Sequence, residues 1–150
     1  MSDGDFRLIG CDANGVPHSP IADLPQDMVD ACEATAALYR RIGFEPPWTG
    51  YIAVANGTAV GGGAFVGPPD QNRVEIAYFT LPDQQGRGYA RRTAEQLVSI
   101  ARATDPKVDV SAKTAPEHNA STIILSRLGF ERVGSTPDDD IGEAWLWLLR

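Results

Sequence analysis

The sequence has little of what marks secreted, metal-binding and membrane proteins. It contains two histidines and two cysteines, Cys11 and Cys32, and the cysteines are not spaced as metal ligands. Two cysteines cannot form the disulfide framework of a small secreted domain, so we expect free thiols. The apolar runs are far shorter than a membrane span, and the N-terminus lacks the basic-then-apolar order of a signal peptide. These absences favour a cytoplasmic protein that does not enter a membrane.

Positive charge is also scarce. The 13 lysines and arginines are outnumbered by 20 aspartates and glutamates, which gives a formal net charge of −7. Because phosphate backbones reward a basic face, a general nucleic-acid binder is excluded. Within residues 87–102, however, four arginines are opposed only by Glu95: Arg87, Arg91, Arg92 and Arg102. A basic segment in an acidic chain indicates a local anionic ligand rather than a polyanion.

The order of secondary structure follows from hydrophobic periodicity and from turn residues. The expected strands are 6–12, 51–55, 58–66, 73–81, 108–114, 130–134 and 143–150. Helices are expected after a cap at Asp23 or Leu24, near 86–103, and after a cap at Asn119 or Ser121. The triple glycine Gly61–Gly63 predicts a bulge or a close backbone approach inside a strand.

The order β-α-β-β-β-α-β-α-β-β predicts one domain, 1–150, of the α+β or α/β class. We expect a single mixed, mostly antiparallel sheet of about six to seven strands with helices on both faces.

The segment LPDQQGRGYARR, residues 81–92, lies where a strand is expected to give way to a helix. A helix N-terminus offers unpaired N–H groups and the positive end of a dipole, and Gly86 and Gly88 leave that turn without side chains. Gln85 and the nearby arginines add hydrogen bonds and charge, as in a pyrophosphate site. Neither the Walker nor the Rossmann pattern is met. A plain tight turn is the alternative interpretation.

Gln85–Ala90 fits the pattern Gln/Arg-x-x-Gly-x-Gly/Ala, which resembles the acyl-CoA-binding signature of the GCN5-related N-acetyltransferase (GNAT) superfamily. The preceding VEIAYFTLP resembles the strand that leads into that signature. PEHNASTIILSRLGF, residues 116–130, resembles the superfamily's second block, especially in the branch of ribosomal-protein N-terminal acetyltransferases. The resemblance covers residues 74–130.

The resemblance implies transfer of an acetyl group from acetyl-CoA to a primary amine of a small molecule or peptide by direct attack. It implies no metal. The strand before the signature would part from the next strand, and the pantetheine arm would bond to its free backbone. A backbone N–H near Leu81 would polarise the thioester carbonyl. The implied cofactor-binding residues are Phe79, Thr80, Leu81, Gln85, Gly86, Arg87, Gly88, Tyr89, Ala90, Arg91 and Asn119.

The attacking amine must be neutral, and Glu75 is the candidate base. Strand parity places Glu75, Ala77 and Phe79 on one face, and the alternative is an exposed or paired strand carboxylate. Many relatives have a tyrosine acid at the position of Leu125, so Tyr78 or Ser121 would have to substitute. Tyr78 is otherwise a core aromatic. The thiol can also leave as a thiolate, since its ordinary pKa is about 8.5.

Asn119 rather than His118 is expected to touch the pantetheine arm, with helix capping as the alternative role for Asn119. The acceptor site is expected near the end of the first helix, the loop 44–50, the Gly61–Gly63 strand and the last hairpin. Two functions remain open at this point: an N-acetyltransferase, or a non-catalytic acyl-CoA-binding module, which the missing tyrosine favours. A homodimer is left open.

Overall fold

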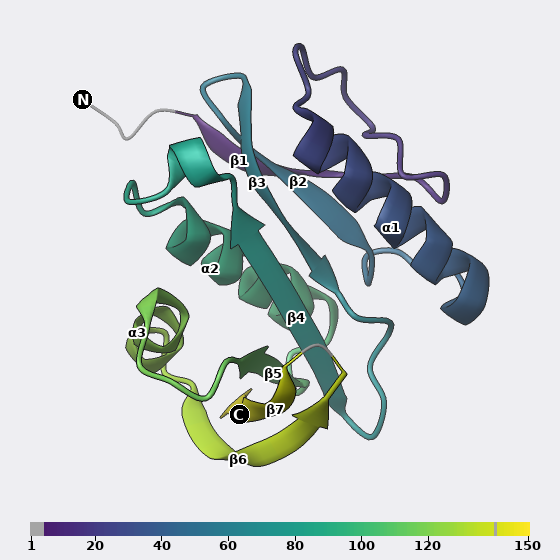
Figure 1. Ribbon diagram of the computed structural model, residues 1–150. Coiled ribbons are helices and arrows are strands. Elements are labelled where there is room, and N and C mark those ends of the chain that lie inside the picture. Colours follow the sequence, from purple (N-terminus) through teal and green to yellow (C-terminus); the bar gives the residue numbers. More distant parts are fainter. Residues whose placement is uncertain (1–4, 140) are drawn as a thin grey trace.

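The computed structural model describes residues 5–139 and 141–150. Within them, seven strands and three α-helices follow one another in the expected order (Figure 1). The strands are β1 (Phe6–Gly10), β2 (Gly50–Ala55), β3 (Thr58–Phe65), β4 (Arg73–Thr80), β5 (Asp109–Thr114), β6 (Glu131–Asp138) and β7 (Gly142–Leu149). The helices are α1 (Gln26–Ile42), α2 (Tyr89–Thr104) and α3 (Ala120–Arg127), with a 3₁₀ turn η1 (Pro82–Gln84) before α2.

The strands form one sheet in the order β1-β2-β3-β4-β5-β7-β6. β4 and β5 pair in parallel, and the other neighbours pair antiparallel. Helix α1 lies on one face of this sheet and α2 on the other (Figure 1). The mixed, mostly antiparallel sheet with helices on both faces is therefore confirmed. No helix in residues 5–139 or 141–150 is long and apolar enough to cross a membrane.

Two helices begin later than the sequence predicts. Pro25, not Asp23 or Leu24, is the residue before the first turn of α1, and Asp23 has a positive φ of 53°. Helix α2 begins at Tyr89 because Gly86 and Gly88 have φ values of 80° and 82°, which no right-handed helix contains.

Strand β3 contains both features that the sequence suggested, a bulge at Val60 beside the glycines and a close backbone approach at Gly61. The pairing of β2 with β3 shifts register between Ala53 and Val54, which is the expected bulge. A Cβ at Gly61 would lie 2.2 Å from the carbonyl oxygen of Phe79, so the backbones of β3 and β4 approach too closely for a side chain. The β3–β4 pair is thus fixed tightly in register.

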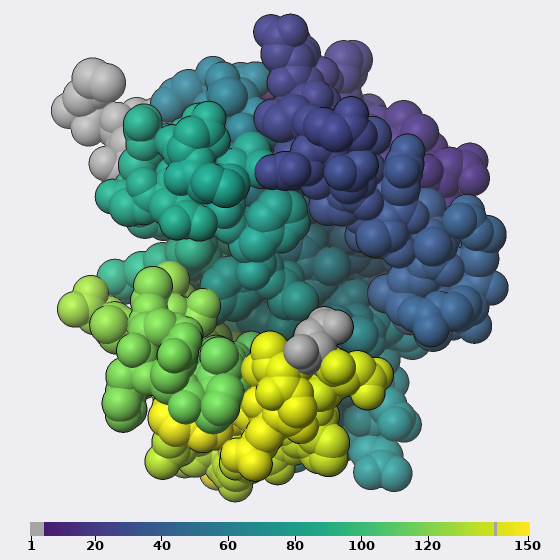
Figure 2. All heavy atoms as spheres, in the orientation of Figure 1, coloured from purple at the N-terminus to yellow at the C-terminus, as the bar shows by residue number. Residues whose placement is uncertain are grey.

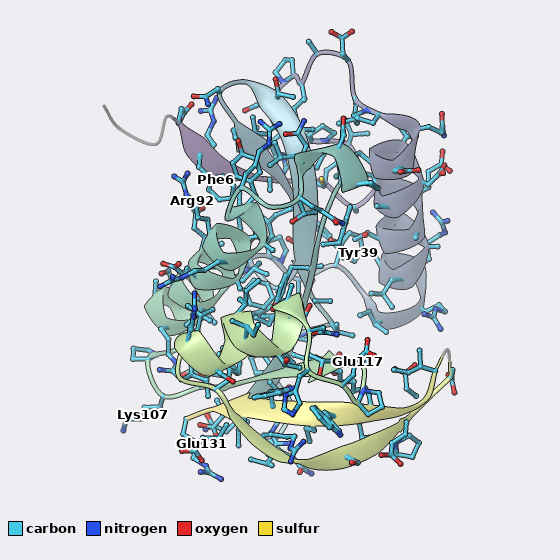
Figure 3. All side chains as sticks on the ribbon, turned by 60° about the vertical axis from the view of Figure 1, so that its left-hand side comes forward. Phe6, Tyr39, Arg92, Lys107, Glu117 and Glu131 are labelled. Atoms are coloured by element: carbon cyan, nitrogen blue, oxygen red, sulfur yellow. The ribbon has the colours of Figure 1, made fainter. Side chains whose placement is uncertain are left out.

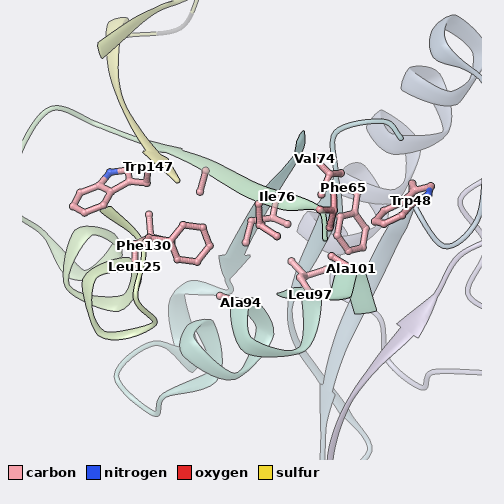
Figure 4. Packing of buried hydrophobic residues seen from close by; sticks show 13 residues of the cluster. Trp48, Phe65, Val74, Ile76, Ala94, Leu97, Ala101, Leu125, Phe130 and Trp147 are labelled. Carbon is pink, nitrogen blue, oxygen red and sulfur yellow. The ribbon is translucent and has the colours of Figure 1, made fainter. Parts of the chain in front are cut away.

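The main core packs α2 and α3 against the sheet (Figure 4). Leu97 and Ala94 of α2, Leu125 of α3 and Ile76 of β4 are almost wholly buried in it. Trp147 of β7 closes the cluster at one end, and its indole N–H donates to Thr114 at 3.0 Å. This core holds one end of β4 firmly against β5.

Candidate active site

Strands β4 and β5 part before either ends. Their pairing stops at Ile76 and Ala112, although β4 continues to Thr80 and β5 to Thr114. On its other edge β4 stays paired with β3, and the Leu81 N–H still donates to Val60 at 2.8 Å. The parting that the resemblance implied is therefore present in the fold.

The ladder fixes which backbone groups of β4 face the gap. The Glu75 carbonyl accepts from the Val66 N–H, and the Leu81 N–H donates to Val60, so the odd-numbered residues of β4 turn their N–H and C=O groups toward β3. The same groups of Tyr78 and Thr80 point to the side where β5 has left. The N–H groups of Phe79 and Leu81 are thus bonded to β3, and of the three residues expected to offer free backbone only Thr80 faces the gap.

A cleft of about 690 Å³ opens between the end of β4, the start of α2 and the start of α3. Figure 2 shows the surface hollowed between the teal segment that begins α2 and the green α3. Most residues predicted for the site line this cleft: Tyr78, Phe79, Thr80, Gln85, Gly86, Gly88, Tyr89, Ala90, Arg91 and Ser121. Residues far apart in sequence were therefore brought together as expected.

Four lining residues were missed by the sequence: Gln84, Ala120, Ile124 and Arg127. Arg127 matters most because it brings a second cation, besides Arg91, to the lining of the cleft from α3. An arginine in the last turn of the second block was the available signal.

The loop before α2 is built to leave space. No described atom lies within 4 Å of the position a Cβ would take at Gly86 or Gly88. None of the described side chains caps the N-terminus of α2, so its first N–H groups remain without intrahelical partners. Gln85 is anchored by its side-chain amide, which donates to the Thr80 carbonyl at 3.3 Å. The open backbone of the two glycines, the positive end of the α2 dipole and Arg91 therefore all lie at the start of α2.

The arginines of this segment have separate roles. Arg87 does not line the cleft. It lines an adjoining groove of about 580 Å³ together with Arg92 and with Arg91, which lines both. Arg91 pairs with Glu95 at 3.1 Å, and Arg92 lies 4.5 Å above the ring of Phe6 (Figure 3). Cation–π packing thus holds Arg92 against β1.

Arg102 is further away from the site than its sequence position suggests. It donates to the carbonyls of Val108 and Leu149 at 2.9 and 3.1 Å, tying the far end of α2 to the sheet. The basic segment is therefore only partly a ligand site.

Tyr78 lines the cleft just beyond the last residue of β4 that pairs with β5, and it packs against the main core, which was its alternative role. Its hydroxyl is buried and has no hydrogen-bond partner among the described residues. Burial raises the pKa of Tyr78 to about 12, so the hydroxyl stays protonated at neutral pH. A buried donor without a partner costs about 1–3 kcal/mol, which a ligand that accepts its hydrogen bond would recover.

Glu75 is paired, as the alternative interpretation of the sequence allowed. Its Oε1 lies 3.6 Å from Nζ of Lys113, and both side chains are partly exposed. Glu75 does not line the cleft, but it shares the face of β4 that carries Ala77 and Phe79. It lies one strand repeat, about 7 Å, from Ala77.

Asn119 also does not line the cleft. Its side-chain oxygen accepts from the Thr122 N–H at 3.1 Å, and Thr122 accepts in return from the Asn119 N–H at 2.9 Å. This capping box is the role left open as the alternative. His118 packs edge-on against Trp145, and Leu125, at the position of the relatives' tyrosine, is fully buried.

A second, smaller cavity of about 180 Å³ lies between α1 and the sheet. It meets the cleft at Tyr78 and Phe79, which line both. Gly62 and Gly63 contribute to its wall, as expected for an acceptor site, but the loop 44–50 and the last hairpin do not. The cavity wall instead includes Cys11 and residues of the buried face of α1.

No group of three or more His, Cys, Asp or Glu that could hold a metal occurs in residues 5–139 and 141–150.

With this geometry in view, family membership can be stated. Residues 13–131 match the model of the acetyltransferase (GNAT) domain. Because the match covers most of the sequence, the chain belongs to the GNAT acetyltransferase family. No curated protein matches the sequence significantly.

Solved structures show the same fold. The chain is similar to YncA of Salmonella typhimurium, a putative acetyltransferase solved with its cofactor acetyl-CoA, with 17% identity, a TM-score of 0.65, and 98% and 94% of the two chains covered. It is similar to RimL, a ribosomal L7/L12 α-N-protein acetyltransferase, with 15% identity, a TM-score of 0.68, and 96% and 92% covered. It is also similar to the aminoglycoside acetyltransferase AAC(6′)-Ib in complex with coenzyme A, with 23% identity, a TM-score of 0.57, and 67% and 65% covered.

The two thiols give a prediction for stability at high pH. Burial, reinforced by the neighbouring Cys32 thiol, raises the pKa of Cys11 to about 12. A raised pKa means that the folded state resists ionisation, so stability is complete below the unfolded pKa, about 8.5, and is lost as pH rises toward 12. Urea unfolding of Cys11→Ala should lose less stability between pH 9 and 12 than wild type does. Parallel losses in both proteins would show that Cys11 is not buried as described.

Proposed function

We propose that the protein transfers an acetyl group from acetyl-CoA to a primary amine. One observation carries this: in a chain of the GNAT acetyltransferase family, the parted edge of β4 leads directly to an uncapped helix N-terminus behind two open glycines. The residues fit acetyl-CoA because the cleft offers three features that suit different parts of that molecule. These are free strand groups, an unpartnered buried hydroxyl and an anion site.

The pyrophosphate of acetyl-CoA would be held by the first N–H groups of α2, with Gln85 and Arg91 beside it. Arg127 faces the same cleft from α3 and adds positive charge. The backbone groups of Tyr78 and Thr80 that face the gap would bond the pantetheine arm. Of the three residues that the resemblance implied for this contact, Thr80 faces the gap, whereas the N–H groups of Phe79 and Leu81 are used by β3.

Tyr78 would stabilise the leaving sulfur. A thiol has an ordinary pKa of about 8.5, well below the value of about 12 for Tyr78, so the tyrosine holds its proton and donates a hydrogen bond to the thiolate. Ser121, which lines the same cleft, is the second donor available. Leu125 cannot take this role, because its side chain is aliphatic and is buried in the core.

Glu75 would receive the proton of the attacking amine. It lies on the face of β4 that carries Ala77 and Phe79, one strand repeat from Ala77 and two from Phe79, so the proton would pass through an intervening water.

Acetyl-CoA binding tests the glycine loop. Gly88→Asn keeps a residue type that tolerates positive φ but adds a side chain where the N–H groups meet the phosphates. We expect the acetyl-CoA Kd to rise about tenfold or more by calorimetry, equivalent to about 1.4 kcal/mol. Gly57→Asn is the matched control, because Gly57 has the same φ of 82° and equally open space far from the cleft. If wild type does not bind acetyl-CoA, the proposed function is wrong. If Gly88→Asn and wild type have equal Kd values, the loop serves only as a turn.

Tyr78→Phe should lower kcat about tenfold to a hundredfold while the KM for acetyl-CoA changes little, because the hydrogen bond matters when charge builds on sulfur. Its melting temperature without ligand should match or exceed that of wild type, since a buried unpartnered hydroxyl is removed. Release of free thiol gives the rate. If Ser121→Ala loses the rate and Tyr78→Phe does not, Ser121 is the donor.

Glu75→Gln should lower kcat/KM for the amine about a hundredfold at neutral pH. Lys113→Met is the control, because it breaks the same ion pair but keeps the carboxylate. Equal rates in both variants would mean that Glu75 only pairs with Lys113. Acetyl-CoA binding without thiol release from a broad amine panel would instead indicate a non-catalytic acyl-CoA-binding module.

A further inference from the structure

The cavity between α1 and the sheet has an unusual wall. Of the described residues that line it, none carries a charge. Its polar side chains are already satisfied: Thr35 donates to Ala31 at 2.9 Å and Tyr51 donates to Pro47 at 2.6 Å. Cys11 and Cys32 hydrogen-bond to each other, so the wall offers almost no free polar side chain to a ligand.

The cavity is placed where an attacking group must come from. The cleft approaches Tyr78 from the side where β5 has parted from β4, and the cavity approaches the same residue from the α1 side. Figure 2 shows the surface hollowed beside the blue α1, with teal strand residues at the bottom. A molecule in the cavity would therefore meet the end of the cleft at Tyr78 and Phe79.

We propose that this cavity binds the acceptor, and that it selects a primary amine carried on a compact apolar body such as a phenyl ring or a short branched alkyl chain. The proposal rests on the proposed acetyltransferase function. The volume of about 180 Å³ suits this size, because an apolar cavity of about 150 Å³ holds benzene. A polyamine or a highly hydroxylated amine would leave charges and hydroxyls unpaired against this wall.

The acyl group itself does not need this space. The family transfers acetyl groups, and an acetyl group has a single methyl to accommodate. The apolar wall also assists the chemistry, because it disfavours the charged ammonium form and so favours the neutral amine that can attack. The amine nitrogen then bonds to the acetyl carbon as the carbon–sulfur bond breaks. The sulfur leaves with the electron pair, and the amine proton passes to Glu75.

The test fills the cavity from α1. Ala31 lines it, and Ala31→Leu extends a side chain into it without harming helix propensity. Ala34→Leu is the matched control, since Ala34 is exposed on the same helix. Both variants and wild type would be assayed by thiol release with phenethylamine, isobutylamine, glycinamide and spermidine. Calorimetry would measure acetyl-CoA binding, and phenethylamine binding in the presence of CoA.

We expect wild type to prefer the two apolar amines. Ala31→Leu should lose about tenfold to a hundredfold in kcat/KM for phenethylamine, with an unchanged Kd for acetyl-CoA. Ala34→Leu should behave as wild type. If neither wild type nor either variant binds acetyl-CoA, the proposed acetyltransferase function itself is contradicted. That outcome is distinct from a failure of the acceptor assignment.

Three results would overturn the acceptor assignment while leaving that function intact. One is a preference of wild type for spermidine or glycinamide. Another is normal acetyl-CoA binding with neither binding nor turnover of phenethylamine. The third is that Ala31→Leu leaves the amine profile unchanged but abolishes use of butanoyl-CoA, which would assign the cavity to the acyl chain.

Discussion

The site depends on the unequal hold that its two neighbours have on β4. β3 stays paired with β4 through the Leu81 N–H, whereas β5 leaves after Ala112. The glycine backbone of β3 allows the first, because Gly61 lets the two chains approach more closely than a side chain would permit. The core around Ile76 enforces the second by fixing where the parallel pairing ends. Between these constraints, the backbone groups of Tyr78 and the Thr80 N–H are left facing the cleft, while the Thr80 carbonyl accepts from Gln85.

Gly86 and Gly88 satisfy two requirements that the sequence could not separate. Both adopt positive φ, so the turn alone would justify glycine, although asparagine also tolerates this region. Both also face empty space, which a turn does not require. The second fact is what connects the loop to ligand binding, because an uncapped helix N-terminus in open space is accessible to an anion.

Much of the fold could be predicted because its signals are local. Alternation, helical spacing and turn glycines gave every element in order, and the segment 81–92 pointed to the cleft. Partners across the chain could not be predicted in this way. Arg92 packs on the ring of Phe6, which is distant in sequence. Asn119 caps α3 by accepting from the Thr122 N–H, so its side chain is engaged in local capping. The sequence also could not show which backbone groups of β4 bond to β3 and which face β5. Alternation along a strand gives the faces of the side chains but not the edge to which each N–H and C=O points.

The burial of Leu125 changes the chemistry expected of the leaving group. In the main core, that position serves packing, so a donor must come from elsewhere. Tyr78 reaches the gap because β4 carries it past the last residue paired with β5. A phenol with a pKa of about 12 is a poor proton source for a thiolate but a good hydrogen-bond donor. In the proposed reaction, Tyr78 would therefore stabilise the departing thiolate rather than protonate it, and Glu75 would take the proton of the amine.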